Sequence, residues 1–284
     1  GRAVGDRKVS QVNDAPGPDD AELVLEAPVG RIRGRWGDGV ARFAGIPYAL
    51  APTGERRFRP PVPVPPAEGE MDARHFGTVC PQNPSLMDAL FGGESEQWDE
   101  DRLHLNVWSP QPSQAARLPV MVWIHGGGFE MGSGSSPLYH GESFARDGVV
   151  FVSINYRLGS LGFLELGGLD SGFAGSGNAG LLDQVEALRW VRDNIECFGG
   201  DPGNVTVFGE SAGAMSVSLL LTMPAARGLF SKAIAQSGAL ASARPVQQAH
   251  ADAAEFMEHL SMSTVEELQQ APVEKLLGAH AAQS

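Results

Sequence analysis

One short segment, Gly209-Glu210-Ser211-Ala212-Gly213, constrains the fold of this chain more than any other. The residues before it, 204–208, predict a short buried strand, and residues 212–222 predict a helix. A serine flanked by glycines at such a corner is typical of the nucleophile turn of acyl-transfer enzymes. The turn is too tight for side chains two residues either side of the serine. We therefore predict that Ser211 is a catalytic nucleophile held at a helix N-terminus.

The rest of the chain predicts an α/β fold with a central, mostly parallel sheet flanked by helices. Buried core strands are expected at 103–108, 118–124, 149–155 and 233–236, and the clearest helix covers 181–198. Short strands at 23–25, 30–36 and 40–43 predict a small antiparallel meander at the start. From residue 246 onward the composition indicates helix, with breaks at 261–263 and at Pro272. In such sheets the chemistry lies at the carboxyl ends of the strands.

A second glycine cluster, His125-Gly126-Gly127-Gly128-Phe129, directly follows the predicted strand 118–124. Three successive glycines allow the backbone to approach a ligand closely with its N–H groups turned inward. By itself the triplet favours a flexible surface loop over an oxyanion hole. Paired with the serine turn, it predicts an oxyanion hole in which Gly127, Gly128 and Ala212 donate, each worth roughly 2.7–4 kcal/mol in the transition state.

The residues beside these donors are predicted to support the pocket rather than to react. His125 is expected to orient the glycine loop by hydrogen bonding, because a base next to the oxyanion donors would approach the serine from the wrong side. Gly126 and Phe129 are expected to shape the same loop. Two interpretations of Glu210 stay open: a buried carboxylate that tunes the pocket, or a turn residue held by hydrogen bonds.

Composition excludes several other classes of function. The net charge of −13 argues against nucleic acid and anionic membranes as partners, and no apolar run is long enough to predict a membrane span. The two cysteines and seven histidines lack metal-ligand spacing, so no metal is expected. Residues 175–180 match G-x-G-x-x-G, but no buried strand precedes them, so a dinucleotide cofactor is not expected.

The chain resembles the amino-terminal portion of a type-B carboxylesterase, a member of the carboxylesterase/cholinesterase family of α/β-hydrolases. The resemblance covers residues 22–240. It is carried by segments at 43–49, 100–108, 125–129, 155–159, 177–184, 198–202 and 207–213. It implies hydrolysis of a small-molecule ester by a Ser–Glu–His or Ser–Asp–His triad with Ser211 as nucleophile, without a cofactor. The alternative is a non-catalytic, esterase-like binding module.

Two departures from the family pattern shape further expectations. In relatives with an early disulfide, a cysteine stands where this chain has Arg102, so the resemblance implies a free thiol at Cys80 and a cytoplasmic protein of bacterial type. Only 73 residues follow Ser211, and His250, His259 and His280 lie in helical sequence and are expected at the surface. We therefore expect residues 21–284 to be the amino-terminal portion of one domain, preceded by a flexible tail at 1–20. A C-terminal segment or second chain would supply the triad acid and histidine.

Overall fold

The computed structural model describes residues 21–84, 97–238 and 243–283. Within these residues, nine strands form one sheet in the order β1-β2-β3-β5-β7-β6-β8-β9, and β4 pairs with β2. The strands are β1 (Glu22–Ala27), β2 (Gly30–Gly37), β3 (Val40–Pro47), β4 (Glu70–Asp72), β5 (His104–Ser109), β6 (Leu118–Ile124), β7 (Val150–Ile154), β8 (Gly200–Glu210) and β9 (Lys232–Gln236). The helices are α2 (Glu142–Arg146), α3 (Gly159–Phe163), α4 (Ala179–Asn194), α5 (Ala212–Leu220), α6 (Val246–Leu260), α7 (Val265–Gln270) and α8 (Val273–Gln283).

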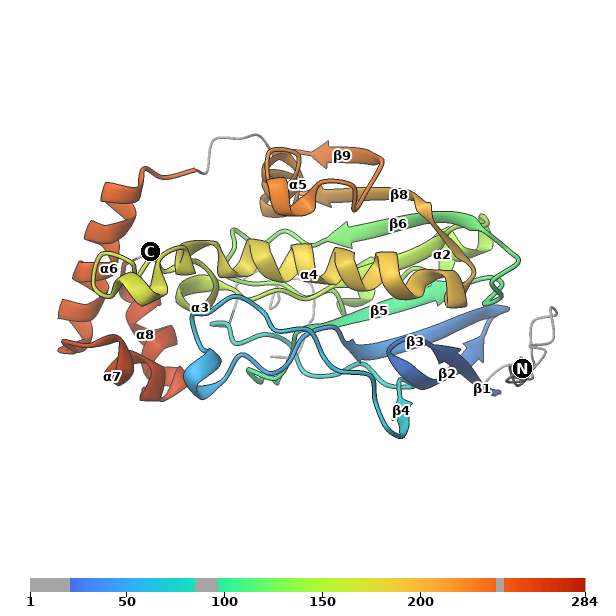
Figure 1. Cartoon of the computed structure of the whole chain (residues 1–284), viewed down its shortest axis with the longest axis horizontal. Helices are drawn as coiled ribbons and strands as arrows, with labels where there is room; N and C mark the ends of the chain where they lie inside the picture. Colours follow the sequence, from blue (N-terminus) through green and yellow to red (C-terminus); the bar gives the residue numbers. More distant parts are fainter. Residues whose placement is uncertain (1–20, 85–96, 239–242, 284) are drawn as a thin grey trace, which may run out of the picture.

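The sheet changes from antiparallel to parallel along its width. Strands β1, β2, β3, β5 and β7 pair antiparallel, whereas β7, β6, β8 and β9 pair parallel. The arrowheads of β6, β8 and β9 point toward the end of the molecule where α6–α8 gather (Figure 1). The carboxyl ends of the parallel strands therefore all lie at the same end of the sheet, which is where ligands bind in such sheets.

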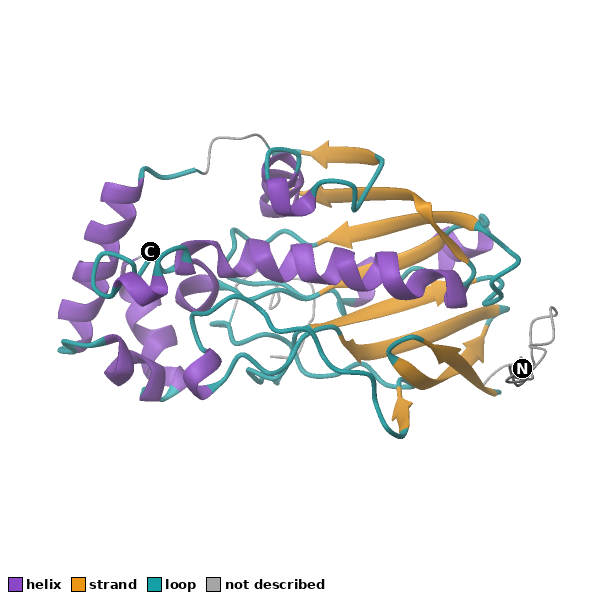
Figure 2. Cartoon of the chain, viewed as in Figure 1, coloured by secondary structure: helices purple, strands orange, loops and turns teal. Residues whose placement is uncertain are grey.

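Side chains of different size occupy the two faces of the sheet. Val122 and Val207 belong to a large core that also contains residues of α4 and α5, whereas their neighbours Trp123 and Phe208 join an aromatic cluster on the other face. This segregation follows from the two-residue period of a strand. The long helix α4 lies across one face of the sheet (Figure 2). The central strands β6 and β7 are thus covered on both sides, as their nearly continuous apolar sequences require.

A buried ion pair fixes α4 to the loop after β7. The guanidinium of Arg157 donates from Nε and Nη2 to the Asp183 carboxylate at 2.8 and 2.6 Å, and the backbone N–H of Arg157 also donates to it at 3.0 Å. Both side chains are almost fully buried. Because both oxygens of the carboxylate accept hydrogen bonds from Arg157, the pair holds the loop that leads into α3 in place against α4.

The C-terminal helices α6, α7 and α8 build a separate small core at the carboxyl edge of the sheet (Figure 1). Phe256, Leu268 and Leu276 pack there against Leu166 and other residues of the main body. Another buried arginine, Arg57, joins the two parts because it pairs with Glu100 at 2.6 Å and donates to the carbonyl oxygens of Gln269 and Ala271. The C-terminal end of α7 is capped in this way.

Most predicted elements are present. The strand at 118–124 matches β6, the three strands of the opening meander match β1–β3, and the helix breaks at 261–263 and Pro272 separate α6, α7 and α8. The strand at 204–208 is longer than predicted, because β8 begins at Gly200. The predicted tail at 1–20 lies outside the described residues.

One strand prediction is wrong in its burial. Residues 233–236 do form β9, but this strand is not in the core: all five of its residues are exposed, and Ile234 is 43% exposed. The reason is its place in the sheet. In the described chain β9 pairs only with β8 and ends the strand order, so a strand of buried composition becomes an open edge.

Candidate active site

Ser211 lies at a sharp corner between β8 and α5. Its backbone has φ 54° and ψ −120°, a combination that is strained for any residue with a side chain. The surrounding hydrogen bonds hold it there: the Ser211 N–H donates to the carbonyl oxygen of Gln236 at 2.9 Å, and its own carbonyl accepts from the Met215 N–H at 3.0 Å. The serine side chain is therefore projected from a fixed turn at the N-terminus of α5.

The two glycines of the corner are required by close backbone packing. A Cβ atom on Gly213 would lie 2.1 Å from the carbonyl oxygen of Ile124, at the end of β6. A Cβ on Gly209 would lie 2.6 Å from the carbonyl carbon of Gly213. Real Cβ atoms do not approach backbone atoms so closely, so only glycine lets the turn pack against the neighbouring strand.

The glycine loop passes directly alongside this corner. A Cβ on Gly126 would lie 3.3 Å from the Ser211 Cβ and 2.8 Å from the Glu210 carbonyl oxygen. Gly127 and Gly128 follow with φ of 106° and 64°, and a Cβ on Gly128 would meet nothing within 4 Å. The structure thus brings the serine turn and the triple-glycine loop together, with open space in front of Gly128.

His125 is a buried anchor of this loop. Its Nδ1 lies 2.8 Å from the Gly126 carbonyl oxygen; because a carbonyl only accepts, Nδ1 carries the proton. The ring stacks on Tyr156 with centroids 4.5 Å apart, and the Tyr156 hydroxyl donates to the His125 carbonyl at 2.9 Å. Burial lowers the pKa of His125 to about 4, so the ring is neutral at ordinary pH.

Phe129 and Glu210 flank the two turns. Phe129 has φ 65°, its carbonyl accepts from the Gly159 N–H at 2.7 Å, and its ring meets Phe163 edge-on with centroids 5.0 Å apart. Glu210 is exposed in the described chain, and its carboxylate lies beside the glycine loop, because a Cβ on Gly126 would be 3.1 Å from its Oε2; the choice between its two interpretations depends on what covers the end of β8. Glu210 is the last residue of β8 and lies opposite Gln236 of β9.

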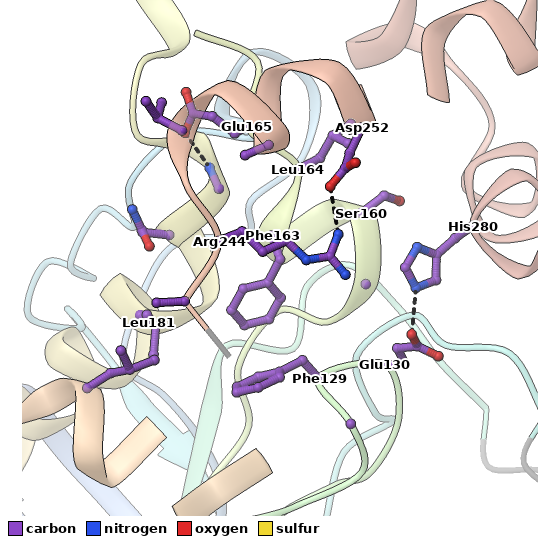
Figure 3. Close-up of a pocket in the computed structure, with 18 residues that line it drawn as sticks. Phe129, Glu130, Ser160, Phe163, Leu164, Glu165, Leu181, Arg244, Asp252 and His280 are labelled. Carbon is purple, nitrogen blue, oxygen red and sulfur yellow. Dashed lines mark hydrogen bonds and ion pairs between the residues drawn. The ribbon is translucent and has the colours of Figure 1, made fainter. Parts of the chain in front are cut away.

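A cavity of about 650 Å³ opens beside the glycine loop. It is bounded by the loop itself, by α3, by the starts of α4 and α6 and by the ends of α5 and α8; its walls include Gly128, Phe129, Phe163, Leu181, Leu219 and Val246. Figure 3 shows the Phe129 and Phe163 rings close together at the centre of the view. No sequence pattern marks this cavity, because its walls come from segments that are adjacent only in the fold.

In the glycine-rich turn at 175–180, where no dinucleotide cofactor is expected, backbone N–H groups bind a carboxylate of the chain itself. The N–H groups of Gly175 and Gly177 both donate to the carboxylate of Glu165 at 3.1 Å, and the Gly167 N–H donates to it at 2.9 Å. A glycine turn of this kind can bind a phosphate through its amides. Here an internal carboxylate already occupies them.

None of the described histidines donates to or accepts from the Ser211 hydroxyl. His259 is exposed, as expected for a surface position. His250 and His280 are less exposed than expected: His250 Nε2 lies 3.9 Å from Glu165, and His280 Nε2 lies 3.5 Å from Glu130. His280 also packs over Gly159, whose Cβ would lie 3.3 Å from its ring. Both side chains remain partly exposed, His250 at 37% and His280 at 24%, so they lie at the surface with a carboxylate beside each.

Three further expectations concern absent features and the cysteines. Cys80 is a free, buried thiol, as the resemblance implies, and its Sγ contacts the carbonyl of Arg102. The described residues contain no cluster of three or more potential metal ligands. Across the part of the chain that the structure describes, no helix combines the length and apolarity needed to cross a bilayer.

A mixed sheet whose parallel half carries a strained serine corner, with a glycine loop beside it, defines an α/β-hydrolase. The chain matches the carboxylesterase family over residues 21–283 and belongs to that family. It is 48% identical to the para-nitrobenzyl esterase of Bacillus subtilis over 241 residues, which cover 84% of this chain and 48% of that protein. It is 47% identical to the fumonisin B1 esterase of Sphingopyxis macrogoltabida over 225 residues, or 78% of this chain and 41% of that protein.

Solved structures agree with this assignment. The carboxylesterase EST55 of Geobacillus stearothermophilus superposes with a TM-score of 0.85 at 46% identity, over 92% of this chain and 53% of that one. The chain therefore spans about half the length of the relatives it matches.

Proposed function

We propose that the protein is a serine carboxylester hydrolase in which Ser211 is the nucleophile. The observation that carries the proposal is the strained backbone of Ser211 at the end of β8, with Gly126 of the triple-glycine loop so close that a Cβ on it would lie 3.3 Å from the Ser211 Cβ. Membership of the carboxylesterase family and the esterase names of the relatives support the same reaction class.

The proposed reaction proceeds in two stages. The Ser211 oxygen bonds to the ester carbonyl carbon while its proton passes to a base; the resulting tetrahedral intermediate expels the alcohol, which takes that proton. Water then adds to the acyl-enzyme and releases the acid. We propose that the N–H groups of Gly127, Gly128 and Ala212 bind the negative oxygen of both intermediates, each contributing roughly 2.7–4 kcal/mol.

We propose further that the base and its acidic partner belong to a segment outside residues 1–284. His125 is a poor candidate because its proton sits on Nδ1, its ring is stacked and buried, and its pKa of about 4 would leave little driving force for proton abstraction. The other described histidines contact other partners or solvent. A serine without an adjacent base is a weak nucleophile, so this segment is needed for full activity.

The substrates that fit this proposal are small esters with a short aliphatic or aryl group. The test is covalent labelling of the full-length protein with a fluorophosphonate, followed by peptide mass spectrometry. We expect stoichiometric label on Ser211 and loss of both label and esterase activity in Ser211→Ala. A full-length protein that hydrolyses esters without a label on Ser211 refutes the assignment of the nucleophile. The absence of both label and hydrolysis favours a binding module.

The location of the base is tested separately by single His→Gln substitutions at the seven histidines of residues 1–284. We expect each variant to keep more activity than Ser211→Ala. A single variant as inactive as Ser211→Ala, but with normal folding, would identify the base within this chain and overturn this part of the proposal.

A further inference from the structure

We infer that Gln82 is a positioning residue for the oxyanion hole. Its side-chain amide binds the far end of the glycine loop at Gly132, 50 residues later in the chain, and so holds the N–H donors of the loop in place. This inference rests on the proposed function, since it assigns those donors to the oxyanion. The contact joins two segments that meet only in the fold.

The Gln82 amide bonds to both backbone groups of Gly132. Its Oε1 accepts from the Gly132 N–H at 2.8 Å, and its Nε2 donates to the Gly132 carbonyl oxygen at 3.1 Å. Nε2 also donates to the Cys80 carbonyl oxygen at 3.0 Å. A neutral carboxamide suits this place because it offers an acceptor and two donors at once. An ionised carboxylate could accept from Gly132 but could donate to neither carbonyl.

Gly132 is the point at which the glycine loop closes on itself. A Cβ on Gly132 would lie 2.5 Å from His125 Nδ1 and 2.7 Å from the Gly126 carbonyl oxygen, so the end of the loop packs against its start. Between these ends, the Gly127 carbonyl oxygen accepts from the Met131 N–H at 3.1 Å. A side chain that fixes the end of this closed loop therefore also limits the movement of the donors within it.

The segment that carries Gln82 is itself tied to the rest of the protein on both sides. On one side, the Val79 N–H donates to the Gln97 carbonyl oxygen at 3.0 Å. On the other, Asn83 Nδ2 donates to the Leu277 carbonyl oxygen of α8 at 3.0 Å. Because the segment is held independently of the glycine loop, its amide can restrain the loop rather than follow it.

Loss of this restraint should affect the reaction more than the binding of substrate. An oxyanion donor acts on charge that develops in the transition state, so its displacement lowers kcat more than it changes KM. Gln82→Met keeps the length of the side chain but has no N–H donor and only a weak acceptor. A misplacement of about 1 Å can cost about a hundredfold in rate, so we expect kcat of the full-length protein to fall by about tenfold to a hundredfold.

Gln82→Glu separates positioning from a purely structural role through its pH profile. Its ionised form places negative charge against two carbonyl oxygens, whereas its protonated form can donate to one of them. This raises the pKa of the introduced carboxyl above its ordinary value of about 4.3. One hydrogen bond is worth about two- to tenfold, so we expect the kcat of Gln82→Glu, relative to Gln82→Met, to rise by at least about twofold between about pH 8 and about pH 5.

The groups beside Gln82 do not titrate in this interval. Burial lowers the pKa of His125 to about 4, and burial raises the pKa of the Cys80 thiol. Ionisation of groups elsewhere in the protein affects both Gln82 variants alike and cancels in their ratio. Gln114→Glu, at an exposed residue, adds the same carboxyl away from the loop and should keep the parent pH profile.

Asn83→Ala is the matched control for the segment. It removes the bond to α8 and leaves the three hydrogen bonds of Gln82 in place. We expect it to keep the parent kcat even if urea unfolding shows a lower stability. An equal loss of kcat in Asn83→Ala and Gln82→Met, or a ratio of the two Gln82 variants that does not change with pH, would overturn the inference.

Hydrogen exchange keeps the inference testable if the protein does not hydrolyse esters. Site-resolved exchange is measured by mass spectrometry on full-length parent and Gln82→Met proteins. We expect faster exchange of the Met131 N–H, which bonds within the loop rather than to Gln82, and unchanged exchange in β6. Unchanged exchange of the Met131 N–H refutes the inference. The expected change in a protein that neither hydrolyses esters nor takes a label on Ser211 refutes only the proposed reaction.

Discussion

Replacing Gly127 by alanine tests whether the triple-glycine loop holds the oxyanion. Gly127 has φ 106°, a conformation that side-chain residues rarely adopt, and its Cβ would lie 2.2 Å from the Met131 carbonyl oxygen. That oxygen belongs to the backbone of the same loop, so the loop has to shift. If the shift removes one donor from the oxyanion, about 2.7–4 kcal/mol of transition-state stabilisation is lost, and kcat falls by about 10²–10³.

The assay is the initial rate of p-nitrophenyl butyrate hydrolysis by the full-length protein, with urea unfolding measured in parallel. Gly148→Ala is the matched control, because Gly148 also has a positive φ, of 82°, but a Cβ there would meet no atom within 4 Å. We expect this control to lose about 1–2 kcal/mol of stability and to keep its kcat. A Gly127→Ala protein with the parent kcat would refute the role of this loop.

Three other predictions concern stability and reactivity. Asp183→Asn breaks the buried pair with the loop after β7 and should cost about 3–5 kcal/mol in urea unfolding, whereas Asp193→Asn, in an exposed pair on the same helix, should cost about 0–1 kcal/mol; equal costs would contradict this account. Iodoacetamide should alkylate half-buried Cys197 and leave buried Cys80 unmodified in the native protein, as peptide mass spectrometry would reveal. Alkylation of Cys80 before Cys197 would contradict the burial of Cys80. Because burial lowers the pKa of His125 from 6.5 to about 4, the unfolded state binds more protons in this interval. The free energy of unfolding should therefore rise with pH from 4 to 6.5, by about 3 kcal/mol from this residue, and His125→Gln should flatten the rise.

The sequence predicts most of the fold because local patterns and long-range packing agree over much of the sheet. Residues 118–124 form a continuous apolar run, and β6 occupies these same residues because β7 and β8 pair with both of its edges and a side-chain core covers each of its faces. The serine corner is equally predictable from the sequence, because Gly209 and Gly213 are required by contacts within the motif and with the adjacent strand. Such features depend on residues close together in the sequence or on direct packing against the adjacent strand.

Features that depend on neighbours far along the chain were not predictable in this way. The composition of β9 indicates a buried strand, but its exposure depends on which elements lie beside it. The same holds for Glu210, whose two interpretations differ only in what covers the end of β8. The cavity joins Phe163, Leu181 and Leu219 from three helices, and no spacing in the sequence marks them as a group.

The carboxylate of Glu165 changes how the glycine-rich turn near it should be interpreted. The chain supplies its own anion to a turn that in other folds captures a phosphate, and this carboxylate belongs to a residue only ten positions before Gly175. Replacing it with alanine would leave three main-chain amides competing for water or for a dissolved anion such as sulfate. A glycine-rich turn of this type therefore indicates backbone N–H groups that bind an anion. The anion can be a ligand, or it can be a carboxylate of the protein itself.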